Sequence, residues 1–249
     1  MTAEVEWPLL VLAGIGAGVS GYVAGMASLV SYPALLAAGL PPVSANVTQT
    51  ISLIFSTLGS VSASRPELAG QLPRLRRLAA VGLLGGLTGS ALLLLTPSGA
   101  FVRIVPWLVA FGSVAILLPR GPETSSAWWH GGFVVPGGVF LVAVYGGYFG
   151  AAAGVLMLAL LLVSTGDTLP RANAAKNFVL GVANAGAALI FSFFGPVHWG
   201  AAVPLAAGLF IGGRLGPAVV RHAPTALLRL LIAVAGLGLA LHLGLHPDT

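Results

Sequence analysis

Cysteine is absent from this 249-residue sequence, so disulfide bonds and thiolate metal ligands are excluded. Charge is almost as scarce, because Asp, Glu, Lys and Arg together make up 7% of the residues. A soluble domain carries about a quarter charged residues, since its surface must face water. A chain that is 57% hydrophobic and so poor in charge is predicted to be an integral membrane protein.

Acidic residues are few, and none falls inside an apolar run. No carboxylate is therefore left within the bilayer for a proton relay, a sodium site or a paired-aspartate protease. The five histidines also lie near segment ends, which disfavours a buried serine–histidine pair. We expect a protein that is not an enzyme and that needs no cofactor or metal ion. The six acidic residues, all near the termini or in predicted loops, are Glu4, Glu6, Glu67, Glu123, Asp167 and Asp248.

Long apolar runs, separated by charged or Pro/Gly-rich breaks, make up most of the chain. Two of them, 8–40 and 131–163, are too long for one straight helix and too short for two full spans. Each has a break of small residues near its middle, at 21–28 and 147–154, which predicts a full helix followed by a shorter or broken one. The predicted fold is an all-α membrane protein of about ten transmembrane segments, five in each half. The other runs are about 43–63, 75–96, 101–119, 171–194, 199–220 and 225–245.

An internal repeat relates the two halves of the chain. A shift of 127 residues places Asn46 on Asn173, and the same shift places the glycine-rich run 85–89 on 212–216. Several matches at one offset indicate a duplication. The predicted organisation is a first membrane repeat at 1–119, an inter-repeat loop at 120–130 and a second membrane repeat at 131–249.

Basic residues indicate how the two repeats are oriented. Four arginines lie in the region 64–77, whereas its counterpart near 194–199 has none. Conversely, Arg214 and Arg221 have no basic counterpart near 86–96. This exchange of loop charge favours an inverted repeat, with the arginine-rich loops on the inner side of the cytoplasmic membrane. The alternative is eight helices in a parallel arrangement of four and four.

Two polar clusters follow proline-marked turns at equivalent places in the two halves. Because proline opens a helix, each turn would direct free backbone N–H groups and a positive dipole end toward whatever lies there. Lys176 is the only lysine in the chain, so the repeat would bring one cation and several amides together as a pocket for a small oxyanion. In the alternative interpretation, Lys176 extends to the cytoplasmic interface and the amides only cap helices. The candidate substrate-binding residues are Asn46, Gln49, Thr50, Asn173, Lys176 and Asn177.

The small-residue breaks also have two interpretations. They are either unwound backbone that lines a cavity at bilayer depth or close packing faces between helices. Their position in the only two over-long runs favours the first interpretation. The candidate broken-helix positions are Gly25, Ser28, Gly150 and Gly154.

Two further patterns of small residues run along the predicted spans. The glycine runs 85–89 and 212–216 are expected to be packing seams between helices. A serine stripe at helical spacing either lines a path or bonds to its own helix. It consists of Ser52, Ser56, Ser60 and Ser64.

Several of these sequence motifs occur in a distinctive order along the chain. A proline-containing run at 32–36 is followed by Gly-Leu-Pro-Pro at 39–42, the Asn46 cluster and a Gly-x-x-Gly-Gly-x-x-Gly span at 82–89, and the pattern returns in the second half. In this the chain resembles the sulfite exporter TauE/SafE family of membrane permeases. The resemblance implies transport of sulfite, sulfonates, sulfoacetate or related small organic anions across the cytoplasmic membrane. Family members typically carry consecutive glycines at each break; here alanine, methionine or serine replaces several of them, which narrows the room for a ligand.

The expected function is a multi-pass permease of the inner membrane that moves a small anion by alternating access between two repeats. Its partners would be the anionic substrate and the lipid bilayer, without nucleic acid. The oligomeric state stays open, with a homodimer as one alternative. The alternatives are a non-transporting membrane scaffold or assembly protein and an anion channel. A central cavity lined by both polar clusters would favour transport over a scaffold.

Overall fold

Helices make up the regular structure of the described residues, which are 7–117, 133–222 and a few isolated positions between 230 and 245. The computed structural model has no strand within these ranges, so the predicted all-α class is confirmed. Among the described helices, four are long and apolar enough to cross a membrane, and shorter apolar helices accompany them. The predicted inter-repeat loop at 120–130 and most of the run 225–245 lie outside the described residues. The helices are α1 (Trp7–Ala24), α2 (Ala27–Ala37), α3 (Pro42–Ala63), α4 (Arg65–Leu68), α5 (Leu72–Leu95), α6 (Ser98–Leu117), α7 (Val134–Tyr148), α8 (Ala153–Thr165), α9 (Leu169–Phe194) and α10 (Trp199–His222).

Prolines and glycines set the ends of several helices. α3 begins at Pro42, and α5 and α9 carry Pro73 and Pro170 in their first turns. A proline suits this position because its fixed φ is helical and the N–H it lacks has no intrahelical acceptor. Gly39 after α2 (φ +83°) and Gly166 after α8 (φ +63°) adopt left-handed conformations that stop a helix.

The first over-long run folds back on itself as a helical hairpin. A Cβ added to Gly21 would lie 2.8 Å from the Cβ of Ala27, and one added to Gly16 would lie 3.8 Å from a methyl carbon of Val30, so α1 and α2 are antiparallel. The turn contains Gly25 at φ +78°, a conformation that residues with a side chain rarely adopt. The predicted break is confirmed, and it reverses the direction of the chain.

The second over-long run has the same shape. Gly146 at the end of α7 packs against Ala153 at the start of α8, and Gly138 packs against Leu160 further from the turn. Ala152, in this turn, is the one non-glycine residue with positive φ among the described residues. A left-handed alanine costs roughly 1–2 kcal/mol, so the packing around the turn must hold it in place.

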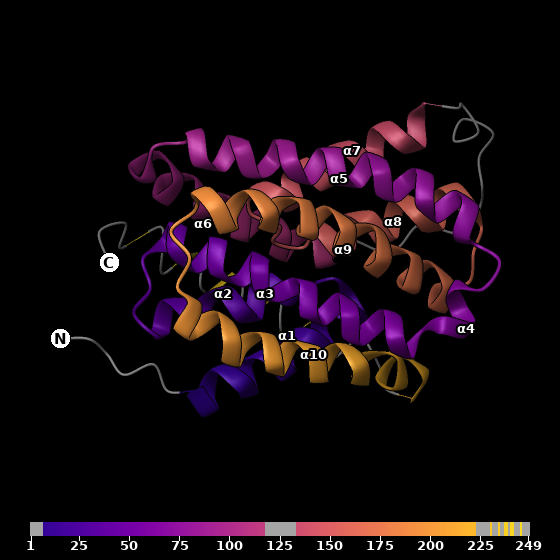
Figure 1. Cartoon of the computed structure of the whole chain (residues 1–249), viewed down its shortest axis with the longest axis horizontal. Coiled ribbons are helices and arrows are strands. Elements are labelled where there is room, and N and C mark those ends of the chain that lie inside the picture. Colours follow the sequence, from indigo (N-terminus) through magenta and orange to yellow (C-terminus); the bar gives the residue numbers. More distant parts are fainter. Residues whose placement is uncertain are drawn as a thin grey trace.

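Two bundles of helices make up most of the molecule (Figure 1). In the first bundle, α1 and α3 pack against α10, and in the second bundle, α7 and α9 pack against α5. The helices within each bundle are parallel to one another, and those of the second bundle run opposite to those of the first. Glycines let the backbones approach closely: a Cβ added to Gly86 would lie 2.0 Å from the Ala183 oxygen, and one added to Gly213 would lie 2.3 Å from the Ser56 oxygen. The predicted glycine runs are therefore packing seams. Each bundle takes helices from both halves of the chain.

The bundles meet where α3 lies antiparallel to α9. Ser44, near the start of α3, donates to the carbonyl of Pro196 just after α9, at 2.8 Å. At the other end of the molecule, Arg171, near the start of α9, donates to the carbonyl of Ala69, which follows α3, at 3.3 Å. We call this second end the basic end, because several arginines gather there: Arg65, Arg74, Arg171 and Arg214.

The antiparallel packing corrects one expectation from the sequence. The proline-led starts of α3 and α9 were expected to point at one ligand, and this is wrong because they lie at opposite ends of the molecule. The local pattern at each proline is as predicted, but the relative direction of the two helices depends on packing between distant parts of the chain.

Candidate functional site

The turns of the two hairpins touch each other inside the molecule. A Cβ added to Gly25 would lie 2.3 Å from the carbonyl carbon of Gly154, so the two backbones are in direct contact. Beside this contact lies a pocket of about 60 Å³, enough for a few water molecules or a small ion. Its lining includes six of the ten predicted site residues: Gly25, Ser28, Gly150, Gly154, Lys176 and Asn177.

Lys176 supplies the positive charge of the pocket. It projects from the second turn of α9 and is 1% exposed. Its Nζ donates to the carbonyl oxygens of Gly21 at 3.0 Å and Tyr22 at 2.9 Å, at the C-terminal end of α1. The ammonium group therefore stabilises the negative end of the α1 dipole while it faces the pocket. Lys176 does not extend to the interface, so that alternative is wrong.

Two helix N-termini also face the pocket. Ala27 and Ser28 in the first turn of α2, and Ala153 and Gly154 in the first turn of α8, line it. The first N–H groups of a helix have no acceptor within the helix, and its dipole is positive at this end. Free N–H groups and positive dipole ends were expected from the starts of α3 and α9, and the starts of α2 and α8 supply them to the pocket instead. Together with Lys176, they create a local environment that favours an anion.

Side-chain donors complete the lining. Ser56 and Thr57 on α3, and Asn177 and Asn184 on α9, face the pocket. Sequence reasoning missed Asn184, although a signal was available, because the 127-residue shift places Thr57 on it. One member of the serine stripe, Ser56, lines the pocket, whereas Ser52 bonds to carbonyls of its own helix and of α10.

The first predicted polar cluster is buried outside this pocket. Asn46 donates to the carbonyl of Tyr148, at the C-terminal end of α7, at 2.8 Å. Gln49 donates to Asn46 at 3.1 Å and accepts from Ser31 on α2 at 2.8 Å, and the Thr50 hydroxyl donates to the Asn46 carbonyl at 2.8 Å. Asn46 and Gln49 thus hold α3 against both hairpins, whereas the Thr50 bond lies within α3. Asn46 thus joins the first bundle to α7, as Lys176 joins the second bundle to α1.

Asn173 is the exception among the predicted residues. It is fully buried, and neither its amide nitrogen nor its amide oxygen has a hydrogen-bond partner. Its equivalent in the first half, Asn46, bonds to the end of α7. In the second half, it is Lys176 that bonds to the corresponding C-terminal end of α1, at the carbonyls of Gly21 and Tyr22.

We expect Asn173→Leu to raise the melting temperature of the purified protein. Removing an unpaired buried amide recovers about 1–3 kcal/mol, and leucine has a similar size. Asn46→Leu is the matched control, because it removes a hydrogen-bonded amide at the equivalent position and should lower the melting temperature. Unfolding followed by tryptophan fluorescence measures both. A fall of similar size in both variants would contradict the assignment.

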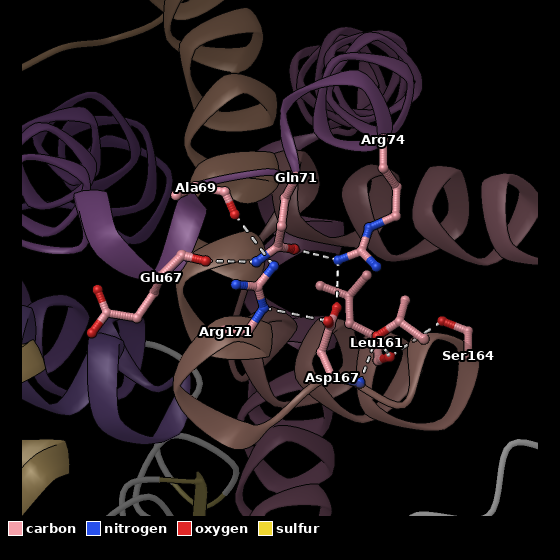
Figure 2. Close-up of polar contacts among 9 residues, drawn as sticks. Glu67, Ala69, Gln71, Arg74, Leu161, Ser164, Asp167 and Arg171 are labelled. Carbon is pink, nitrogen blue, oxygen red and sulfur yellow. Dashed lines mark hydrogen bonds and ion pairs between the residues drawn. The ribbon is translucent and has the colours of Figure 1, made fainter.

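A cluster of charged and amide groups joins the helix ends at the basic end (Figure 2). Asp167, between α8 and α9, accepts a hydrogen bond from Arg74 on α5, and its second oxygen lies 3.6 Å from Arg171 Nε. Arg74 also donates to Gln71, whose amide donates to the Glu67 carbonyl at 2.7 Å. Figure 2 shows Asp167 between the two guanidinium groups. The cluster ties the loop before α9 to the segment that connects α3 with α5.

The surroundings of Asp167 lower its pKa below the usual range. Burial alone would raise the pKa of this carboxyl, but hydrogen bonds from Arg74 and Thr165 and the charges of Arg74 and Arg171 outweigh it. Because the pKa is lower in the folded protein, the ionised carboxylate stabilises the fold at neutral pH. This contribution is lost as the pH falls through the folded pKa, below the ordinary value of 3.8.

We therefore expect Asp167→Asn to lower the free energy of unfolding at pH 7. The loss should be only about 1 kcal/mol, because the cluster is partly exposed and solvent screens its charges. The difference from the unmodified protein should shrink as the pH falls below the ordinary aspartate range and vanish once Asp167 is protonated. Arg76→Gln, on an exposed part of the same helix as Arg74, is the control and should have little effect. Melting temperatures measured across pH test this, and a pH-independent difference would contradict it.

A family model described as "Sulfite exporter TauE/SafE" matches residues 10–243. The chain belongs to the TauE/SafE family. It is thus a multi-pass membrane protein of a transporter family, not an enzyme, and the resemblance seen in the sequence is confirmed.

Relatives of this family member match over most of both chains. The probable membrane transporter protein ORF9 of Sinorhizobium sp. is 24% identical over 98% of this chain and 95% of its own length. The probable membrane transporter protein YfcA of Escherichia coli strain K12 is 28% identical over 88% of this chain and 82% of its own length. A probable membrane transporter protein of Haemophilus influenzae is 26% identical over 91% of this chain and 89% of its own length. No solved structure matches the chain.

Proposed function

We propose that this protein carries a small anion, such as sulfite, a sulfonate or a related organic anion, across the cytoplasmic membrane. The observation that carries the proposal is the convergence of Lys176 and the N-termini of α2 and α8 on one pocket. A buried cation and two positive helix ends select negative charge. No Asp or Glu is among the residues that line the pocket, so nothing there opposes an anion.

Lys176 is the counter-charge in this proposal, and Asn177 and Asn184 donate hydrogen bonds to the substrate. The substrate is compact, because the pocket is about 60 Å³ and the methyl groups of Ala27 and Ala153 face it. Asn46 and Gln49 have a different role, since they position the hairpins, and Thr50 bonds within α3. The amide of Asn173, unpaired in the structure, would meet the substrate only after the bundles move.

The moving parts are the two bundles. Lys176 on the second bundle is bonded to the end of α1 on the first, and an anion in the pocket would compete with those two carbonyls for the ammonium group. Binding would therefore weaken a contact between the bundles at the centre of the molecule. This links occupancy of the site to alternating access.

Two equivalent contacts support an inverted repeat of 1–119 and 131–249. Gly59 packs against Phe210. The 127-residue shift makes Gly186 the equivalent of Gly59 and Leu83 the equivalent of Phe210, and Gly186 packs against Leu83 in the same way. A parallel duplication would have α3 and α9 running in the same direction, whereas they are antiparallel. With the arginines of the basic end in the cytoplasm, α1 starts at the outer surface.

Uptake by proteoliposomes tests the proposed function. We expect saturable uptake of labelled sulfite that requires the protein and is reduced by unlabelled sulfite or small sulfonates. Counterflow would identify a carrier, whereas a sustained ionic conductance would identify a channel. Protein that is folded but moves none of these anions would overturn the proposal in favour of a scaffold.

Orientation is tested with single cysteines, because the natural chain has none. Gly70→Cys lies at the basic end and Pro196→Cys lies at the opposite end. In intact cells, an impermeant thiol reagent should label position 196 and not position 70. Labelling of both from one side would contradict the inverted arrangement.

A further inference from the structure

An apolar groove opens on the side of the molecule between the two bundles. It has a volume of about 590 Å³ and lies between α3 and α9, and Leu83 of α5 is also among its lining residues. Leu58 and Leu189, on its two sides, are 53% and 58% exposed. In a membrane-spanning protein such side chains face lipid, so the groove is open to acyl chains.

Positive charge lies at one end of this groove. Arg65, at the basic end, is among its lining residues. Ser62, which also lines the groove, accepts a hydrogen bond from Arg214 of α10 at 3.3 Å, so a second guanidinium group lies beside it. No Asp or Glu is among the lining residues of this described groove, and Glu67 has one carboxylate oxygen buried within the protein. An apolar groove that ends at two exposed arginines matches the chemistry of an anionic lipid.

A second groove provides a contrast within the same molecule. It has a volume of about 490 Å³ and lies between α3 and α10, inside the first bundle. Trp199 lines it and no charged residue does. This groove can accept an acyl chain but offers no cation to a headgroup.

We propose that the groove between α3 and α9 binds an anionic phospholipid of the arginine-rich leaflet. Its phosphate lies at Arg65 and Arg214, and an acyl chain lies along Leu58 and Leu189. Basic pockets between transmembrane helices on the cytoplasmic side are suited to such headgroups. The site is distinct from the anion pocket, and binding there does not depend on the transport proposal.

The position of this lipid gives it a route to influence transport. Thr57 lines both the groove and the anion pocket, and its methyl group packs against Gly181, where an added Cβ would lie 2.1 Å away. The lipid therefore lies against a thin wall of the pocket, at the junction of the two bundles. Its occupancy supports that wall when the bundles move.

Native mass spectrometry of the full-length protein tests the proposal, with phosphatidylglycerol and phosphatidylcholine of the same chain length as probes. We expect phosphatidylglycerol to bind about tenfold more tightly, from two arginines near the membrane surface. The double variant Arg65→Gln with Arg214→Gln should lose this preference. Arg76→Gln with Arg77→Gln, two exposed arginines at the same end, should keep it.

Tail binding is tested separately from headgroup binding. Ala185→Trp fills the groove between α3 and α9 and should weaken phosphatidylglycerol binding although both arginines remain. Ala207→Trp fills the contrasting groove and should not. Glycerol 3-phosphate should compete poorly, because it lacks the acyl chain. Equal binding of both lipids by the unmodified protein, or a preference that survives the loss of both arginines, would overturn the proposal.

Discussion

Replacing Lys176 with methionine is expected to reduce the initial rate of sulfite uptake by about a hundredfold or more. Removing one partner of a buried charge pair typically costs about 2–5 kcal/mol, and about 1.4 kcal/mol corresponds to a factor of ten. Methionine has a similar length, so packing between α9 and the end of α1 is largely retained. The lost bonds to Gly21 and Tyr22 are offset in part because no buried ammonium group needs to be desolvated.

Two controls separate charge from structure in this experiment. Arg103→Met removes another cation, on an exposed part of α6 away from the pocket, and should leave uptake near its normal rate. Lys176→Arg retains the charge with a larger group and should recover part of the activity. If Lys176→Met is folded and transports sulfite at the normal rate, the assignment of Lys176 as counter-charge is wrong.

Replacing Gly25 with alanine is expected to disrupt the contact between the two hairpins. The new Cβ would lie 2.3 Å from the carbonyl carbon of Gly154, a distance that requires the two backbones to move apart. The residue would also be held at φ +78°, which costs roughly 1–2 kcal/mol for an L-residue. We expect a large fall in melting temperature, a smaller yield of monodisperse protein and loss of uptake.

Gly39 offers a matched control for backbone strain. It has a similar φ of +83°, but a Cβ added there would meet no atom within 4 Å. Gly39→Ala should therefore show only the cost of the left-handed conformation, with transport retained. If the two variants have the same stability and activity, the close approach of the hairpins at Gly25 contributes to neither.

Local signals accounted for the membrane class, the helix starts and the positions of the two breaks. Pro42, Pro73 and Pro170 stand in first turns, where the N–H that proline lacks would have no acceptor within the helix. Gly25 permits a left-handed turn that few other residues allow. The internal offset also contained the signal for Asn184, through its equivalence to Thr57.

The composition of the pocket was predictable only in part. Lys176 and Asn177 line it, but the polar cluster around Asn46 binds the hairpins instead. These sets have similar residue types in similar local sequence, so nothing local distinguishes them. Which carbonyl or cavity each side chain meets depends on helices from the opposite half of the chain.

The sequence by itself determined that this protein is helical, lies in a membrane and has an interrupted helix in each half. Those properties follow from composition and from the conformational limits of proline and glycine, which act within a few residues. Only the tertiary structure decided that each interrupted run is a hairpin and that α3 and α9 are antiparallel. It also brought the starts of α2 and α8, not those of α3 and α9, to Lys176. The physical reason is that the direction of the helices and the contact between the hairpins depend on close packing between glycines and residues far apart in the chain. The absence of a Cβ on a glycine allows such an approach only when the distant helix is in place.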